Sequence, residues 1–188
     1  MKKSKVQIII GGAGGQGILT AGKVLSYACI KSGLEVSCLP AYGAEMRGGY
    51  VYCILTISNS EDVFSPISSE CDVGVFLNEK SFHMLSSYLK QGALIFLNSS
   101  LIKNKNKKAF EFPATEEAEK IGDGKVANMI FVGALIPFIK KMFNKFRKED
   151  ILWGVEKLIR NEKLKDLSKK AIERGLKLLE PGSEKWEI

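Results

Sequence analysis

The sequence of 188 residues lacks the clustered cysteines and histidines from which most protein metal centres are built. His83 is the only histidine, and we expect a surface or packing role for it. No two of the four cysteines lie within four residues of each other, which is not the C-x-x-C spacing of zinc or iron–sulfur ligands. No metal site is therefore expected in this chain. Isolated thiols in apolar segments are usually buried, and we expect this of Cys29, Cys38, Cys53 and Cys71.

Long apolar runs are also missing. None approaches the ~20 residues that a membrane-spanning helix needs, so no membrane contact is expected. The start of the chain, MKKSKVQIII, has the basic head of a signal peptide, but its apolar stretch continues directly into GGAGGQG without a cleavage site. We interpret residues 5–10 as a first β-strand instead, and we expect the protein to be cytoplasmic.

The chain carries a formal net charge of +7, but it lacks the aromatic residues between its lysines that base stacking on nucleic acid would need. Residues 1–100 contain 8 basic and 7 acidic side chains, whereas residues 101–188 contain 20 and 14. The excess positive charge therefore lies in the second half, on amphipathic stretches. A solvated helix face, or a surface that docks an acidic partner, accounts for it better than nucleic acid does.

What the sequence does contain is a series of apolar runs and amphipathic segments. Short apolar runs rich in β-branched residues predict strands at residues 5–10, 34–42, 50–58, 71–78 and 93–98. Apolar residues at helical spacing predict helices at residues 18–33, 79–92, 114–122, 125–143, 148–159 and 164–180. Gly33 and Gly92 are expected to end two of these helices, and Thr115 is expected to cap another.

The order of these segments predicts a single α/β domain over residues 1–188. It opens with a strand, a glycine loop, a helix and a strand, which is a right-handed crossover unit by the usual rule. Strands dominate the first half and helices the second, and no linker is long enough to divide the chain. We expect a Rossmann-like three-layer sandwich with a mostly parallel sheet and a helical C-terminal part.

A glycine loop follows the first predicted strand. Gly12, Gly14 and Gly17 fit the pattern G-x-G-x-x-G at a junction between a strand and a helix. Glycines permit a tight turn and a close backbone approach, and the free N–H groups at the start of a helix attract anions. The loop also contains Gly15 and Gln16, whose amide can donate or accept hydrogen bonds. Both an anion site and a purely structural turn fit this pattern.

The same pattern does not favour a dinucleotide. NAD and FAD sites need an acidic residue roughly 20 positions after the loop, at the end of the second strand. Here the second strand ends in Pro40 and Ala41, and Glu35 lies at its other end. The missing acid makes NAD the weakest of the three interpretations.

A second glycine-rich loop, AYGAEMRGG at residues 41–49, follows the second predicted strand at the same edge of the sheet. Arg47 is the only arginine in the first hundred residues, and Gly48 gives the backbone freedom to aim its guanidinium group. Arg47 can pair with Glu45 or clamp an anion. The binding candidates in this loop are Tyr42, Arg47 and Gly48.

Three further residues are candidates by position. Asn128 opens an apolar helix, and its amide can reach the glycine loops or bond to buried backbone. Asn78 and Glu79 follow a predicted strand at the edge where open α/β sheets bind ligands. No residue of the chain is assigned a catalytic role.

Several motifs of the chain occur in a specific order. They are GGAGGQG, AYGAEMRGG, YCILTIS, SPISSECDVGVFLNEKS, GALIFLNSSLI and ANMIFVGAL. Together they resemble the gamma subunit of 2-oxoacid:ferredoxin oxidoreductases, and YGAEMRGG is most similar to the 2-oxoglutarate type. The resemblance covers residues from 6 to about 140, and the helical tail beyond it matches no motif of that family.

The resemblance implies a subunit of an enzyme that converts a 2-oxoacid, CoA and oxidised ferredoxin into an acyl-CoA, carbon dioxide and reduced ferredoxin. It places thiamine diphosphate and Mg²⁺ in alpha and beta subunits, and [4Fe–4S] clusters in the beta subunit or a small delta subunit. The gamma-like domain is associated with CoA. The glycine loops are then expected to form an anion pocket for CoA phosphates, or the subunit contact around the thiamine site.

Two alternative functions stay open at this point. A self-contained Rossmann-like nucleotide-binding reductase is disfavoured by the missing acid after the second strand. A purely structural subunit would use its loops only to brace its neighbours. The sequence does not indicate which 2-oxoacid is used, because its contacts are expected mainly in other chains.

If Arg47 clamps a phosphate, Arg47→Ala should raise the Michaelis constant for CoA in the assembled complex at least tenfold. A charge-assisted hydrogen bond contributes about 1.5–3 kcal/mol, which is a roughly 10- to 150-fold change in affinity. Arg47→Lys should recover only part of this, because a point charge cannot reproduce the planar fork. Steady-state kinetics with CoA and the 2-oxoacid measure both. If Arg47→Ala leaves the Michaelis constant for CoA unchanged but lowers the melting temperature, and Glu45→Gln lowers it similarly, Arg47 forms an ion pair with Glu45 instead.

Overall fold

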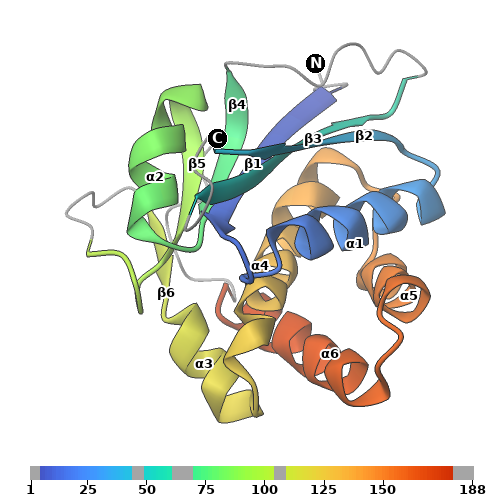
Figure 1. Cartoon of the computed structure of the whole chain (residues 1–188). Coiled ribbons are helices and arrows are strands. Elements are labelled where there is room, and N and C mark those ends of the chain that lie inside the picture. Colours follow the sequence, from blue (N-terminus) through green and yellow to red (C-terminus); the bar gives the residue numbers. More distant parts are fainter. Residues whose placement is uncertain (1–4, 44–48, 61–69, 104–108, 180–188) are drawn as a thin grey trace.

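The computed structural model describes residues 5–43, 49–60, 70–103 and 109–179, which form a sheet with helices on both faces (Figure 1). The strands are β1 (Lys5–Ala13), β2 (Glu35–Tyr42), β3 (Tyr50–Ser58), β4 (Cys71–Phe76), β5 (Leu89–Asn98) and β6 (Phe110–Phe112). The α-helices are α1 (Ile18–Lys31), α2 (Glu79–Leu85), α3 (Ala114–Ile121), α4 (Ala127–Met142), α5 (Lys148–Leu158) and α6 (Glu162–Lys177). Short 3₁₀ segments cover Ser86–Tyr88 and Gly124–Val126.

The sheet is mixed but mostly parallel. Its strand order is β2-β3-β1-β4-β5-β6, and only β3 runs antiparallel to its neighbours β1 and β2. β2 is therefore parallel to β1, and α1 is the crossover between them. This arrangement confirms the predicted α/β fold, with β3 as the interior strand that its apolar sequence indicates.

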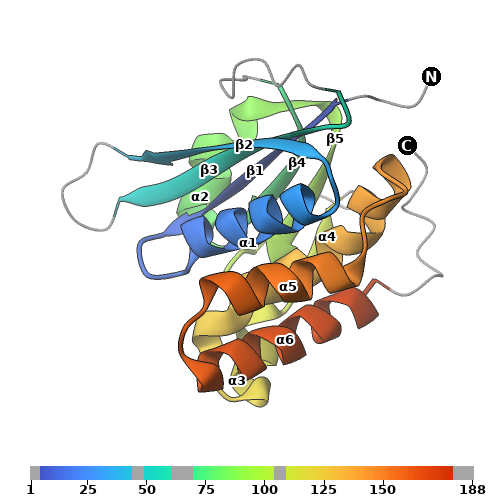
Figure 2. The same cartoon turned by 90° about the vertical axis from the view of Figure 1, so that its right-hand side faces the viewer.

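The helices form one layer on one face of the sheet and two layers on the other. α2 covers the first face, whereas α1 and α4 cover the second and carry α5 and α6 as an outer layer (Figures 1 and 2). Strand β1 serves both sides, because Ile8 and Ile10 join the larger core and Ile9 joins the smaller one beneath α2. None of the helices in the described ranges is long and apolar enough to cross a bilayer.

The first crossover follows the sequence closely. Helix α1 ends at Lys31, and Gly33, with a φ of 66°, lies just beyond it in the predicted capping role. The N–H of Gly33 donates to the carbonyl of Ile30 at 3.0 Å, and that of Leu34 donates to Cys29 at 2.9 Å. This pair of bonds is a Schellman motif, in which glycine takes the left-handed conformation at low cost.

The predicted helix over residues 79–92 is wrong in its second half. Helix α2 stops at Leu85, and β5 begins at Leu89 because pairing with β4 outweighs the helical spacing of this segment. Gly92 ends no helix, and its φ of 80° instead fits the register shift where β5 pairs with β4.

The predicted cap at Thr115 is also wrong, because the N-cap residue of α3 is Pro113, two residues earlier, and Thr115 lies within the first turn. The Thr115 hydroxyl instead accepts a hydrogen bond from the Asn98 amide at 2.9 Å. The Asn98 side-chain oxygen accepts from the backbone N–H of Thr115 at 3.3 Å, so a residue of β5 satisfies the start of this helix. The three-residue strand β6 was not predicted.

Helices α4 and α6 cross at two glycines. A Cβ atom on Gly133 would overlap the carbonyl oxygen of Ile172, and one on Gly175 would overlap the carbonyl oxygen of Ile130. The two backbones approach each other closely only because both side chains are absent. This crossing attaches the helical C-terminal part to the helix nearest the sheet.

We expect Gly133→Ala and Gly175→Ala each to lower the free energy of unfolding by about 1 kcal/mol or more. Alanine is favoured over glycine in a helix interior by about 0.8–1 kcal/mol, but overpacking against backbone costs about 1–3 kcal/mol and should prevail. Lys170→Ala on the exposed face of α6 is the control, with an expected change below about 0.5 kcal/mol. Chemical denaturation measures all three. A Gly175→Ala chain as stable as the parent would contradict the close crossing.

Candidate functional site

The ends of β1 and β2 bring the starts of the two glycine loops to one edge of the sheet. Ala13, the last residue of β1, pairs with Tyr50 at the start of β3. Tyr42, the last residue of β2, pairs with Val51. The N–H of Gly43 donates to the carbonyl of Tyr50 at 2.7 Å and extends this ladder. Both loops therefore leave the sheet at neighbouring positions.

Of the binding candidates in the second loop, Tyr42 lies at the end of β2 with 68% of its surface exposed. Arg47 and Gly48 lie outside the described residues, so their proposed roles stay predictions. The described geometry of the site therefore comes from the first loop and from the elements that hold it.

A tight turn directs the chain from β1 into α1. The N–H of Gln16 donates to the carbonyl of Ala13 at 3.2 Å, and Gly15 has a φ of 88°. A positive φ at the third position is that of a type II turn, which favours glycine. Gly17, with a φ of 69°, is the N-cap residue of α1. Backbone conformation thus explains two of the loop glycines.

Packing explains a third glycine but not the fourth. A Cβ atom on Gly12 would lie 2.5 Å from the Cδ1 atom of Ile18 and 2.8 Å from Oε1 of Gln16. Gly14 has no positive φ, and a Cβ atom there would meet no described atom within 4 Å. Neither strain nor packing against the described residues explains the missing side chain at Gly14, which is exposed to solvent.

Hydrogen bonds fix the direction of the Gln16 amide. Its Oε1 accepts from the N–H of Ala13 at 2.7 Å and from Nδ2 of Asn78 at 3.0 Å. The Oδ1 of Asn78 accepts from the N–H of Ser81 at 2.8 Å and caps α2. Because a backbone N–H can only donate, both amide orientations are determined. The Nε2 group of Gln16 has no acceptor within the described ranges and can donate to a ligand.

Asn128 holds the loop against α4. Its Nδ2 donates to the carbonyl of Gly17 at 2.8 Å, and only 4% of the residue is exposed. The buried amide therefore bonds to backbone, and that backbone belongs to the glycine loop. A Cβ atom on Gly17 would overlap this amide, so Gly17 is required by its neighbour as well as by its own φ.

The start of α1 faces this loop without a side-chain cap and without an acidic residue in its first turn. The N–H groups of Ile18, Leu19 and Thr20 have no acceptor within the helix, and they lie at the positive end of its dipole. Together with the exposed turn and the Gln16 amide they form a surface rich in hydrogen-bond donors. Such a surface attracts anions.

A cavity of about 180 Å³ adjoins the loop. Its polar lining includes Gly15, Thr20, Lys125, Asn128 and Ser168, and its apolar lining comes from α4 and the junction of α5 and α6. Pockets that enclose a small-molecule ligand have volumes of roughly 300–1,000 Å³, so this cavity holds only part of a nucleotide-sized molecule. Sequence reasoning missed Thr20, Lys125 and Ser168. No motif marks them, and they come from α1, the 3₁₀ segment before α4 and α6, which only the tertiary fold brings together.

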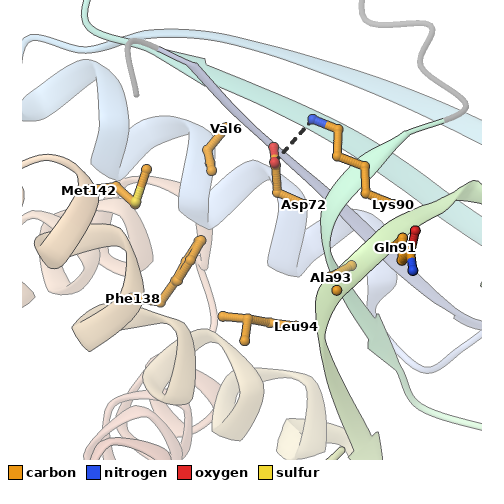
Figure 3. Close-up of a pocket in the computed structure, with 9 residues that line it drawn as sticks. Val6, Asp72, Lys90, Gln91, Ala93, Leu94, Phe138 and Met142 are labelled. Carbon is orange, nitrogen blue, oxygen red and sulfur yellow. Dashed lines mark hydrogen bonds and ion pairs between the residues drawn. The ribbon is translucent and has the colours of Figure 1, made fainter. Parts of the chain in front are cut away.

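A second cavity, of about 100 Å³, lies at the opposite edge of the sheet, at the amino ends of β1 and β4 (Figure 3). Phe138 from α4 points toward the sheet beside it (Figure 3). Asp72 accepts from the N–H of Gln7 at 2.9 Å and pairs with Lys90 at 3.1 Å, so its carboxylate links three strands. The cavity is far from the glycine loop along β1, and its polar groups have a structural use.

The other candidates lie outside the loop contacts. Glu79 and His83 form an exposed pair on α2, with 3.7 Å between Oε1 and Nε2, so His83 is at the surface as predicted. Within the part of the chain that the structure describes, no group of three or more His, Cys, Asp and Glu side chains can hold a metal ion. No set of four cysteines comes together among the described residues, so they do not form the usual ligand set of an iron–sulfur cluster. Cys29, Cys53 and Cys71 are buried as predicted, whereas Cys38 is only partly buried.

Residues 7–178 match the model of the pyruvate ferredoxin/flavodoxin oxidoreductase family, and the chain belongs to this family. It is 34% identical over 135 residues to the ketoisovalerate oxidoreductase subunit VorA of Methanothermobacter marburgensis, covering 70% of this chain and 28% of the relative. It is 32% identical over 140 residues to the 2-oxoglutarate synthase subunit KorC of the same organism, covering 69% of this chain and 75% of KorC. The chain thus spans just over a quarter of the length of VorA.

Solved structures share the fold. A keto/oxoacid ferredoxin oxidoreductase gamma subunit from Geobacter sulfurreducens superposes with a TM-score of 0.73 at 25% identity, covering 92% of this chain and 97% of the other. A 2-oxoglutarate:ferredoxin oxidoreductase from Magnetococcus marinus gives 0.78 at 22% identity, covering 94% of this chain and 31% of the other. The family match reaches residue 178, so the tail after residue 140 belongs to the family domain although its motifs did not indicate this.

The two kinds of glycine in the loop predict different effects on stability. Gly17→Ala should lower the free energy of unfolding by about 1–2 kcal/mol from the left-handed backbone alone, and by more through displacement of the Asn128 amide. Gly14→Ala is the matched control, with an expected change below about 0.5 kcal/mol. Thermal and chemical denaturation compare them. Equal losses would show that Gly14 has a packing role that its described surroundings do not reveal.

Proposed function

We propose that this chain is the gamma-type subunit of a 2-oxoacid:ferredoxin oxidoreductase and that its first glycine loop binds the phosphate groups of CoA. Family membership and the names of the relatives support the oxidoreductase context. The observation that carries the CoA role is the exposed turn at Gly14. It has no side chain, no described neighbour that requires this, and the uncapped start of α1 beside it.

The described residues would bind a phosphate without a metal ion. The N–H groups at the start of α1 and the Nε2 of Gln16 are the donors, and Lys125 on the cavity lining adds a positive charge. Asn78 and Asn128 hold the donors in place through Gln16 and Gly17. The cavity of about 180 Å³ is smaller than CoA. The rest of the molecule would lie against the second loop, with Arg47, and against partner subunits.

In this proposal the chain binds and orients CoA, and other subunits carry out the decarboxylation and the electron transfer. Thiamine diphosphate with Mg²⁺ would supply decarboxylation in alpha and beta subunits, and iron–sulfur clusters in the beta or a delta subunit would pass electrons to ferredoxin. The described residues of this chain include no cluster of Cys, His, Asp and Glu side chains that could bind an iron–sulfur cluster or the Mg²⁺ of thiamine diphosphate. The isolated chain is then expected to be inactive, and the working form is a hetero-oligomer.

We propose 2-oxoglutarate as the substrate of the complex. The motif YGAEMRGG supports this choice. The Magnetococcus marinus enzyme is a 2-oxoglutarate:ferredoxin oxidoreductase whose structure contains 2-oxoglutarate, coenzyme A and succinyl-CoA. The relatives are named for different substrates, ketoisovalerate and 2-oxoglutarate, so the family alone leaves the choice to experiment.

A purely structural subunit is the alternative with an observation in its favour. Gly12, Gly15 and Gly17 are explained by packing and backbone conformation, as a bracing loop would require. The two functions make different predictions for Gly14, because only CoA binding requires that this residue lack a side chain. A self-contained nucleotide-binding reductase has less support, because β2 ends in Ala41 and Tyr42 and no acid stands there for a ribose.

Gly14→Val in the assembled complex tests the CoA role. The added side chain would occupy the space in which a phosphate approaches the backbone, so the Michaelis constant for CoA should rise at least tenfold, the equivalent of one charge-assisted hydrogen bond of roughly 1.5–3 kcal/mol. The constant for the 2-oxoacid should stay unchanged, and Lys170→Ala on α6 is the control. An unchanged Michaelis constant for CoA in an assembled complex would favour the bracing role over CoA binding.

A further inference from the structure

Two cysteines from neighbouring strands face α1. Cys38 on β2 pairs with Leu55, and Cys53 on β3 pairs with Pro40. The cysteines are thus diagonal neighbours on one face of an antiparallel pair, within reach of each other's side chains. Figure 2 shows that these strands lie directly over α1.

A glycine on α1 leaves space for both sulfur atoms. A Cβ atom on Gly22 would lie 2.7 Å from Sγ of Cys53 and 3.3 Å from Sγ of Cys38. Both sulfurs therefore converge on the same point, and no side chain of α1 separates them. This proximity could not be predicted from the sequence, because fourteen other residues separate the two cysteines along the chain.

The surroundings differ between the two thiols. A hydrogen bond from Cys53, aided by Ser26 and the positive charge of Lys23, lowers the pKa of the partly buried Cys38 to about 7 against the effect of its burial. The same interaction and burial raise the pKa of Cys53. Burial, with a neighbouring carboxylate in each case, raises the pKa of Cys29 to about 12 and that of Cys71 to about 11.

The Cys53 thiol has a second acceptor. Its sulfur lies 3.8 Å from the carbonyl oxygen of Ile18, in the first turn of α1. A thiol has one proton, so Cys53 can donate either to Ile18 or to the Cys38 sulfur. The protonation or oxidation of Cys38 therefore affects whether Cys53 donates to the first turn of α1, next to the glycine loop.

We propose that Cys38 and Cys53 form a thiol pair that hydrogen peroxide oxidises to a disulfide. The Cys38 thiolate attacks the O–O bond, which breaks to give a Cys38 sulfenic acid and, with one proton, a water molecule. Cys53 then attacks the sulfenic sulfur, its proton leaves with the hydroxyl group as a second water, and the S–S bond forms. The two thiols lose two electrons, and the peroxide accepts them.

The fold permits this bond with a small movement. Diagonal neighbours have Cα atoms roughly 7–8 Å apart, whereas a disulfide needs roughly 4.4–6.8 Å. Among the described strands β2 lies at the edge of the sheet and pairs with β3 alone, so it can shift by the difference. Bond formation removes the Cys53 proton from Ile18 and should loosen the first turn of α1.

The test treats the full chain with hydrogen peroxide and maps the products by mass spectrometry. We expect a Cys38–Cys53 crosslink that a dithiol reductant reverses, with a mass loss of two hydrogen atoms. Cys53→Ala should instead leave a Cys38 sulfenic acid that dimedone captures, and Cys71→Ala should crosslink like the parent. Iodoacetamide at neutral pH should label Cys38 at least about tenfold faster than Cys29 or Cys71.

Amide hydrogen exchange should be faster at the first turn of α1 in the disulfide form than in the reduced form. The proposed thiol pair is wrong if the chain fails to crosslink or crosslinks to Cys29. It is also wrong if iodoacetamide labels Cys38 no faster than Cys71. The N–H of Ala21 donates to the carbonyl of Gly17, and that of Gly22 is the helical partner of the Ile18 carbonyl. Unchanged exchange at Ala21 and Gly22 in a fully crosslinked chain would overturn the link of the thiol pair to α1. None of these measurements depends on CoA binding, so they can fail or succeed independently of the proposed function.

Discussion

The hydrogen bond from Asn128 to the carbonyl of Gly17 is the contact on which the rest of the site depends. It joins the glycine loop, and with it the start of α1, to the first turn of α4. Helix α4 is in turn fixed to α6 by the close crossing at Gly133 and Gly175. The helical C-terminal part, which carries no recognisable motif, therefore determines where the loop stands.

Two chemically different groups meet at the first turn of α1. On one side lie N–H groups that no side chain caps, together with the exposed turn at Gly14. From the other side the Cys53 thiol contacts the carbonyl of Ile18 beneath the helix. Oxidation of the thiol pair and binding of an anion would thus act on the same few residues. This proximity follows from the order β2-β3-β1, which places both cysteine strands beside the glycine loop.

Local signals in the sequence predicted the local features of the structure. The first strand, the turn into α1 and the glycine that follows this helix depend on neighbouring residues, and the kind of each was predicted correctly. The end of the strand was not, because β1 continues to Ala13 by pairing with β3. Features set by long-range pairing were not. Residues 89–92 were predicted as helix but belong to β5, and Gly92 lies at the register shift between β4 and β5. The side chain of Asn98, and not that of Thr115, accepts a hydrogen bond from an N–H at the start of α3. The convergence of Cys38 and Cys53 could not be predicted for the same reason, because the pairing register of two strands does not follow from the sequence of either strand alone.

The most direct test of the CoA site is a structure of the assembled complex with CoA bound. The account predicts a CoA phosphate oxygen roughly 2.7–3.2 Å from backbone N–H groups at the start of α1, with its closest approach at the Gly14 turn. It also predicts that Nε2 of Gln16 donates to the same phosphate. A complex in which partner subunits hold every CoA phosphate, while the turn at Gly14 contacts only their backbone, would contradict it.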